Sequence, residues 1–293
     1  MDETILIIGA SGLIGSSLFE HFSKKYSVVG TYNAHSFNKL IHLDLLNKDE
    51  LEKILKNVKP EVILLPAALT NVDYCEKEKN ECRKQNIIAP LTLINSIKNS
   101  SVKLVYYSTD YVFDGKNGPY SEEDNPHPLN EYGKSKLETE INIKQNLTKF
   151  LILRTTVVYG WEHLGKNFVY SLIKNLKSGQ TIRVPKDQIG TPTYVENIAE
   201  ATLELIKSDM HGIYNIAGPQ LVDRHSLALI VAEVFDLNKS LILPIKTSEL
   251  HQLAPRPLSA GLKINKLLKS IKVKMLSPRE ALQQMKQNPK ENI

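Results

Sequence analysis

The sequence has few cysteines and lacks the long apolar or basic runs that mark several classes of protein. Its two cysteines, Cys75 and Cys82, lie on one predicted helix with no histidine cluster nearby, which predicts reduced thiols and no metal site. No segment is apolar enough to span a bilayer. The 37 basic and 32 acidic residues give a charge of +5 without a basic stripe, which argues against a nucleic-acid partner. We therefore expect a cytoplasmic protein whose mild positive charge suits an anionic small molecule.

Three glycines stand between an apolar strand and a helix near the beginning of the chain. Thr4–Ile8 is a predicted strand, a helix extends to about Ser23, and a second strand is expected at Val28–Tyr32. Glycines at such a turn let the backbone approach a pyrophosphate that faces the helix N-terminus. A plain tight turn is the alternative. The pattern predicts a dinucleotide site whose contacts are Gly9, Ser11, Gly12, Leu13, Ile14 and Gly15.

The end of the second predicted strand bears on the choice of cofactor. It ends Thr31-Tyr32-Asn33, and no acid follows until Asp44, whereas a carboxylate at this place would bind the ribose 2′-hydroxyl of NAD. We therefore expect NADP(H), with NAD(H) as the alternative. A further strand at Glu61–Leu65 ends in small residues across which a cofactor can lie. The remaining predicted cofactor contacts are Thr31, Asn33, Asp44, Leu45, Ala67, Ala68, Thr70, Tyr107 and Lys136.

A strand that ends in hydroxyl and acid side chains precedes a Tyr-x-x-x-Lys pair. The apolar run Lys103–Tyr107 is followed by Ser108-Thr109-Asp110, and Tyr132 and Lys136 share one face of a later predicted helix. A nearby ammonium is expected to lower the pKa of a phenol from about 10. Such a pair, with a hydroxyl beside it, can deliver a proton to a carbonyl oxygen. Tyr170 and Lys174 show the same spacing, but no such strand precedes them, and we interpret them as an ordinary helix face.

Strands and helices alternate through the first half of the chain, as in a doubly wound parallel α/β sheet of the Rossmann type. A long helix with Asn86 in its middle is expected to reach about Ser100, and a strand covers Phe150–Val158. Later elements are a helix at Gly165–Lys177, a strand at Thr181–Val184, a helix at Val195–Lys207, a strand at Gly212–Ala217, a helix opened by the capping box Ser277–Glu280, and a disordered tail from Lys286. We predict a dinucleotide-binding domain (1–158 and about 185–217) and a smaller C-terminal substrate-binding lobe (about 159–184 and 218–293).

Several strings now combine into a resemblance that covers nearly the whole chain. The sequence resembles the extended short-chain dehydrogenases/reductases, and within them the dTDP-4-dehydrorhamnose reductase group. The strings are the glycine triplet, Ser108-Thr-Asp-Tyr-Val-Phe-Asp-Gly115, Tyr132-Gly-Lys-Ser-Lys136, Arg154-Thr-Thr-Val-Val-Tyr-Gly160, Asn167-Phe168, Asp187-Gln-Ile-Gly-Thr-Pro-Thr193 and Arg256-Pro257. Val157 departs from the pattern, because the family often has Trp there.

The resemblance implies a function and a set of roles. Thr109, Tyr132 and Lys136 would be catalytic, and the pocket for a nucleotide-sugar would be lined by Tyr111, Asn167, Gln188 and Arg256. The implied reaction is NADPH-dependent reduction of dTDP-4-dehydrorhamnose to dTDP-rhamnose. The resemblance also leaves open a homodimer and a divalent ion at a subunit contact.

Two other functions are compatible with the same fold. Nucleotide-sugar dehydratases need a pair of acids after the threonine, but Tyr111 follows Asp110 here. The regulatory β subunit of methionine adenosyltransferase is a non-catalytic relative that shares several of the strings.

Overall fold

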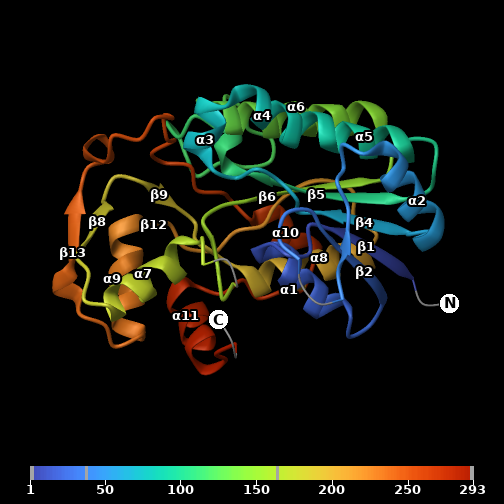
Figure 1. The fold of residues 1–293 in the computed structure, drawn as a ribbon. Helices are drawn as coiled ribbons and strands as arrows, with labels where there is room; N and C mark the ends of the chain where they lie inside the picture. Colours follow the sequence, from blue (N-terminus) through green and yellow to red (C-terminus); the bar gives the residue numbers. More distant parts are fainter. Residues whose placement is uncertain (1–2, 37–38, 163–164, 291–293) are drawn as a thin grey trace.

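The computed structural model describes residues 3–36, 39–162 and 165–290, and a parallel sheet with helices on both faces forms its centre (Figure 1). The sheet has seven strands in the order β11-β6-β5-β4-β1-β2-β3. Their bounds are β1 (Thr4–Ile8), β2 (Ser27–Tyr32), β3 (Ile41–His42), β4 (Val62–Leu65), β5 (Lys103–Thr109), β6 (Phe150–Thr155) and β11 (Gly212–Asn215). The expected doubly wound α/β sheet is confirmed.

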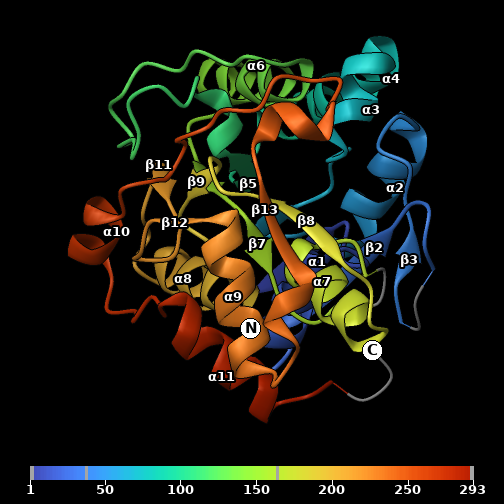
Figure 2. The ribbon, with the colours of Figure 1, turned by 90° about the vertical axis from the view of Figure 1, so that its left-hand side faces the viewer.

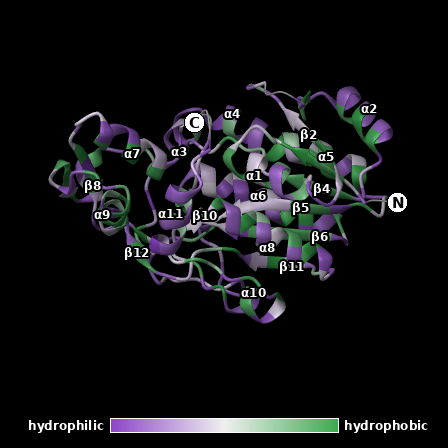
Figure 3. Cartoon of the chain, turned by 90° about the horizontal axis from the view of Figure 1, so that it is seen from below, coloured by the Kyte–Doolittle hydropathy of each residue, from purple (hydrophilic) through white to green (hydrophobic). Residues whose placement is uncertain are grey.

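Two hydrophobic cores hold helices against the two faces of this sheet. On one face lie α1 (Leu13–Phe22), α8 (Val195–Lys207) and α10 (Asn265–Ser270), and on the other α2 (Lys48–Val58), α5 (Ala89–Ile97) and α6 (Glu131–Asn146). Figure 3 shows the result, with predominantly hydrophobic strands such as β4 inside and helices such as α2 that alternate in polarity outside. Buried on both faces, the strands are continuous apolar runs rather than alternating ones.

A third core lies to one side of the sheet, at the left in Figure 1, and its elements face the viewer in the turned view of Figure 2. Its side chains come from three helices and several short strands: α7 (Phe168–Lys177), α9 (Arg224–Val234), α11 (Pro278–Gln287), β7 (Val158–Tyr159), β8 (Ile182–Pro185), β10 (Thr193–Tyr194), β12 (Val222–Asp223) and β13 (Ile242–Ile245). The short strand β9 (Ile189–Gly190) pairs with β12. The apolar side chains between Leu262 and Met275 instead join the core of the large sheet. The proposed domain boundaries stay a prediction.

The chain leaves the middle of the sheet in two directions, and this topology predicts the edge at which a ligand would bind. From β1 it passes to β2 and β3 on one side, and from β4 it continues through β5, β6 and β11 on the other. In open parallel sheets the crevice lies at the carboxyl ends of the strands beside such a switch point. The glycine turn after β1, Ala67 after β4 and Thr109 at the end of β5 all lie at that edge.

Several local predictions need correction. The predicted strand Phe150–Val158 ends at Thr155, because Val157 has a φ of 44°, which no strand residue adopts. The helix predicted from Gly165 begins at Phe168, since Gly165 has a φ of 61° and Asn167 is the N-cap. Val195–Lys207 and the capping box of Ser277 and Glu280 are confirmed.

The predicted long helix around Asn86 consists of four pieces. They are α3 (Val72–Lys77), α4 (Lys79–Arg83), a π-helical turn (Lys84–Ile88) and α5, so the two cysteines lie on separate short helices. Both thiols are free and buried.

The tail is not disordered from Lys286. Helix α11 extends to Gln287, and the Lys290 ammonium lies 2.7 Å from a carboxylate oxygen of Glu20. Residues 291–293 lie outside the described part. No helix among the described residues has both the length and the apolar character that crossing a membrane requires.

Candidate active site

The glycine turn is closed so tightly that side chains would not fit. A Cβ on Gly15 would lie 2.1 Å from the carbonyl oxygen of Gly9, and one on Gly9, whose φ is 95°, would lie 2.9 Å from Ala67. The Gly9 amide donates to the hydroxyl of Thr31 (3.4 Å), which therefore supports the turn from β2. Gly12 caps α1 without a side-chain hydrogen bond, so the helix N-terminus is left to a ligand. These features fit the pyrophosphate of a dinucleotide.

The other predicted cofactor residues differ in how accessible they are. Asn33, directly after β2, and Thr70, in the loop after β4, are exposed, and Ala67 and Ala68 are half-buried. The carboxylate of Asp44 accepts from the amide of Leu46 (3.0 Å), and Leu45 is buried in a core. The hydroxyl of Tyr107 donates to Thr202 (3.1 Å) on α8. No group of three or more His, Cys, Asp or Glu that could hold a metal ion occurs in the described ranges.

The three predicted catalytic residues meet at the end of β5 and the first turns of α6. Asn130 caps α6 by accepting from the amide of Gly133 (2.9 Å), and this sets Tyr132 and Lys136 on the buried face of the helix. The Lys136 ammonium donates to the carbonyl of Tyr107 (2.7 Å). Thr109 ends the strand, and its hydroxyl lies close enough to the Tyr132 phenol to lower the pKa of that phenol. The structure therefore brings the predicted trio together.

The charge states of this pair differ from the expectation. Burial raises the pKa of Tyr132, the nearby Thr109 hydroxyl lowers it, and Asp110 and Tyr111 raise it further. The predicted lowering of the Tyr132 pKa is therefore wrong: burial has the largest effect, and Lys136 is not among the groups that lower this pKa. Burial also lowers the pKa of Lys136 to about 7. A phenol with a raised pKa stays protonated at neutral pH, which is the form that a proton donor needs.

Asp110 lies directly behind the trio and is fully enclosed. Its carboxylate accepts from the hydroxyls of Thr156 (2.6 Å) and Thr109 (3.1 Å). Burial raises the pKa of Asp110 to about 6, although these hydrogen bonds and the charge of Arg224 act in the opposite direction. The carboxylate therefore orients the Thr109 hydroxyl from within the protein.

Asn86 anchors the loop after β4 to the catalytic helix. Its side-chain oxygen accepts from the amide of Leu69 (2.8 Å), and its amide group donates to the Leu69 carbonyl (3.0 Å) and the Ser135 hydroxyl (3.1 Å). The residue is buried in the π-helical turn, a feature that often marks functional sites. Asn86 is therefore a positioning residue and not a solvated one.

The predicted substrate residues are only partly brought together. The ring of Tyr111 packs edge-on against Tyr132 at 5.7 Å between centroids. Arg256 forms an ion pair with Asp73 (3.0 Å), and Gln188 lies next to Arg224, whose amide donates to the Gln188 carbonyl (3.0 Å). Asn167 caps α7, with its amide group donating to Gly160 (2.9 Å) and Glu162 (2.8 Å), so its polar atoms already have partners.

Arg224 is the main residue that the sequence reasoning missed. It is the first residue of α9, its guanidinium lies 5.1 Å from the ring centre of Phe168, and its charge acts on both Tyr111 and Asp110. The guanidinium forms no ion pair or hydrogen bond within the described part of the chain. The pairing of β12 with β9 carries Arg224 to Gln188, and no sequence motif signals that pairing.

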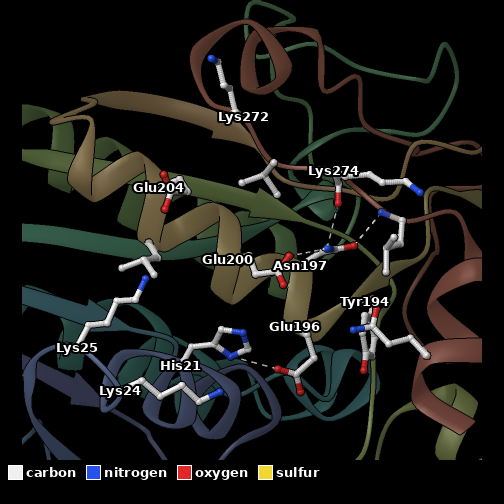
Figure 4. A pocket seen from close by; sticks show the side chains of 14 residues that line it. His21, Lys24, Lys25, Tyr194, Glu196, Asn197, Glu200, Glu204, Lys272 and Lys274 are labelled. Atoms are coloured by element: carbon white, nitrogen blue, oxygen red, sulfur yellow. Dashed lines mark hydrogen bonds and ion pairs between the residues drawn. The ribbon is translucent and has the colours of Figure 1, made fainter. Parts of the chain in front are cut away.

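A hollow of about 520 Å³ between α1, α8 and residues 272–276 shares no lining residue with this site (Figure 4). The carboxylate of Glu196 there accepts from Ser17 (2.9 Å) and pairs with His21 (3.2 Å) and Lys290 (3.3 Å). The charge of this carboxylate is therefore compensated by its neighbours.

Comparison with known proteins identifies the family of the chain. A family model described as the RmlD substrate binding domain matches residues 3–290. The chain belongs to the RmlD family. It is an extended short-chain dehydrogenase/reductase, and its fold is that of solved RmlD structures. A dTDP-4-dehydrorhamnose reductase from Bacillus anthracis, solved in complex with NADP, superposes with a TM-score of 0.89 at 31% identity, covering 97% of this chain and 99% of that one.

Two kinds of RmlD-type relative have similar identities. A dTDP-4-dehydrorhamnose reductase from Aggregatibacter actinomycetemcomitans is 34% identical over 275 residues, covering 90% of this chain and 91% of the relative. Methionine adenosyltransferase 2 subunit beta from Xenopus laevis is 32% identical over 272 residues, covering 90% of this chain and 81% of the relative. Sequence identity therefore does not separate a dTDP-4-dehydrorhamnose reductase from a methionine adenosyltransferase 2 subunit beta.

Proposed function

We propose that this RmlD-family chain is an NADPH-dependent reductase that acts on the 4-keto group of a nucleotide-diphosphate 6-deoxysugar. The observation that carries the proposal is the trio of Thr109, Tyr132 and Lys136 beside the glycine cradle. The preferred substrate is dTDP-4-dehydrorhamnose, by analogy with the named reductase relatives. The test is NADPH oxidation over a panel of nucleotide 4-keto-6-deoxy sugars.

The roles follow from the chemistry of the side chains. The backbone of the glycine turn holds the pyrophosphate, and the Lys136 ammonium holds the nicotinamide ribose. NADPH, when bound, supplies the hydride. Tyr132 donates its phenolic proton to the substrate carbonyl oxygen, as general acid catalysis requires. The Thr109 hydroxyl turns from Asp110 to the same oxygen and stabilises the charge that develops there.

Two guanidinium groups are available for the diphosphate of the substrate. Arg224 has no acidic partner among the described residues, whereas Arg256 is held by Asp73 (3.0 Å). The Arg224 guanidinium is therefore ready to bind phosphate without breaking an ion pair. A planar guanidinium suits phosphate oxygens better than an ammonium does.

Arg224→Met is expected to raise the KM for the sugar nucleotide roughly tenfold with little change in kcat. A hydrogen bond to a charged group contributes this much, and the diphosphate does not change during the reaction. Steady-state kinetics are the measurement. Arg183→Met, which removes an exposed arginine from β8, is the control and is expected to change neither constant. An unchanged KM in Arg224→Met would remove Arg224 from the phosphate site.

NADPH is expected to bind at least as tightly as NADH, because no acid ends β2. Direct titration of both cofactors is the measurement. Asn33→Asp places a carboxylate at this exposed position and is expected to weaken NADPH binding by about tenfold or more, since like charges in contact are costly. A clear preference of the wild type for NADH would assign the ribose to Asp44 or to a backbone group.

The regulatory-subunit function is the second candidate, and the similarity to methionine adenosyltransferase 2 subunit beta favours it. Under that alternative the chain would bind cofactor but would not turn over any keto sugar. The intact trio argues for turnover.

A further inference from the structure

The ammonium of Lys136 lies against an aromatic face that the reaction scheme does not use. Its Nζ atom is 4.1 Å from the ring centre of Tyr106 and donates to the carbonyl of Tyr107 at 2.7 Å. Lys136 is 2% exposed, and Tyr106 is 1% exposed on the helix-facing side of β5. A cation at this distance is attracted by the negative face of a ring, most strongly where water is excluded.

The other charged or titratable groups near Lys136 compensate its burial incompletely. Glu140, one turn further along α6, and Cys82 on α4 raise the pKa of Lys136, while burial lowers it to about 7. The Glu140 carboxylate is shared, because it also accepts from Arg154 at 2.6 and 3.0 Å. The phenol of Tyr132 is neutral, so it adds no charge. A further contact that stabilises the ammonium would therefore increase the fraction of Lys136 that is charged.

The hydroxyl of Tyr106 has no part in this arrangement. It is buried without a hydrogen-bond partner among the described residues. The neighbouring hydroxyl of Thr139 donates instead to the carbonyl of Asn86 (2.6 Å). A buried hydroxyl without a partner is destabilising, so a phenylalanine would serve as well. The part of Tyr106 that contacts Lys136 is therefore its aromatic ring.

We propose that Tyr106 is a positioning residue for Lys136, whose ammonium it holds in the charged form over its ring face. The inference rests on the proposed function in one respect, that Lys136 binds the cofactor ribose. The contact itself belongs to the protein alone and can be tested without cofactor or substrate.

The first test is urea unfolding of the cofactor-free protein between about pH 5.5 and pH 9, for Tyr106→Phe, Tyr106→Leu and Tyr106→Met. The unfolded chain holds the Lys136 proton up to a pKa near 10.4, and the folded protein only up to about 7. Between these values the unfolded state binds more protons, so this group makes stability rise with pH. Removing the Tyr106 ring lowers the pKa of Lys136 in the folded protein further. The pH range over which stability rises with pH therefore begins at a lower pH.

The expected result is a pH-dependent difference between Tyr106→Leu and Tyr106→Phe. The extra destabilisation of the leucine variant is greatest below about pH 6 and shrinks as the pH rises past 7, where Lys136 is neutral. The unfolding equilibrium constants change relative to each other by roughly 2- to 30-fold across this range, from the usual strength of the interaction. Tyr106→Met repeats the test with a side chain that adapts to the space. Tyr106→Phe is expected to be at least as stable as the wild type.

Two outcomes would overturn the proposal. A difference between leucine and phenylalanine that does not depend on pH would mean that Tyr106 only fills space. A phenylalanine variant that behaves like leucine would assign the effect to the hydroxyl.

The second test is the pH dependence of the NADPH dissociation constant. In Tyr106→Leu, binding is expected to weaken at a lower pH than in the wild type, and Tyr106→Phe is expected to match the wild type. Superimposable profiles for all three proteins would contradict the proposal. Neither measurement requires turnover, so an inactive wild type would refute the reductase function and leave this inference standing.

Discussion

Tyr132→Phe is expected to reduce turnover by about 10²- to 10⁴-fold while cofactor affinity stays nearly unchanged. The substitution removes the proton donor, and this is the usual contribution of general acid catalysis. The ring stays in place, since it packs edge-on against Tyr111 and contacts the buried Cys75 and Cys82. The measurements are kcat on the best keto sugar of the panel and the dissociation constant of NADPH.

Tyr170→Phe is the matched control, because Tyr170 and Lys174 have the same spacing on α7. The Tyr170 ring lies 6.1 Å from that of Trp161, in the third core. We expect turnover to be unchanged when Tyr170 loses its hydroxyl. Near wild-type turnover in Tyr132→Phe would contradict the assignment of Tyr132 as the proton donor.

Glu140→Ala is expected to lower the free energy of unfolding by about 3–5 kcal/mol. Glu140 is fully buried and pairs with Arg154, whose side chain is 2% exposed, at 2.6 Å. The Ser108 hydroxyl donates to the same carboxylate at 2.5 Å, so one group joins β5, β6 and α6 behind the catalytic residues. Removing it leaves the Arg154 charge buried without a partner. Urea unfolding at neutral pH is the measurement.

The double variant Glu140→Met with Arg154→Met separates the ion pair from the space that it fills. With neither charge left in the interior, most of the lost stability is expected to return. A single variant within about 1 kcal/mol of the wild type would contradict this account, because surface changes have effects of that size. A double variant as unstable as the single one would assign the loss to packing or to Ser108.

The parts of the fold that were predictable from sequence are those set by local patterns. Thr4–Ile8 and Val195–Lys207 came from apolar periodicity alone, and the capping box of Ser277 fixed the start of α11. The strand that ends at Thr155 was predicted to continue to Val158, because a β-branched residue such as Val157 normally indicates a strand. Val157 instead has a left-handed backbone conformation, which its residue type does not predict. Similarly, the π-helical turn at Lys84–Ile88 is stabilised by contacts of Asn86 with Leu69, which is distant in the sequence.

For the site, spacing identified the reactive groups but not their surroundings. Tyr132 and Lys136 were recognisable because four residues make about one helical turn. The direction of the Tyr132 pKa shift was not, since it depends on burial by several elements. Arg256 was expected to line the nucleotide-sugar pocket, but its guanidinium forms an ion pair with Asp73 from α3. Arg224 reaches the same region through the pairing of β12 with β9.

The measurement that tests the central claim most directly is NADPH oxidation by the purified wild type with dTDP-4-dehydrorhamnose and other nucleotide 4-keto-6-deoxy sugars. Our account predicts turnover of at least one of these sugars, the dehydrorhamnose compound first among them, and loss of that turnover in Tyr132→Phe. Good turnover of another keto sugar alone would contradict the specific substrate and keep the reductase class. Tight binding of NADPH without turnover of any sugar would contradict the reductase function and favour a regulatory subunit.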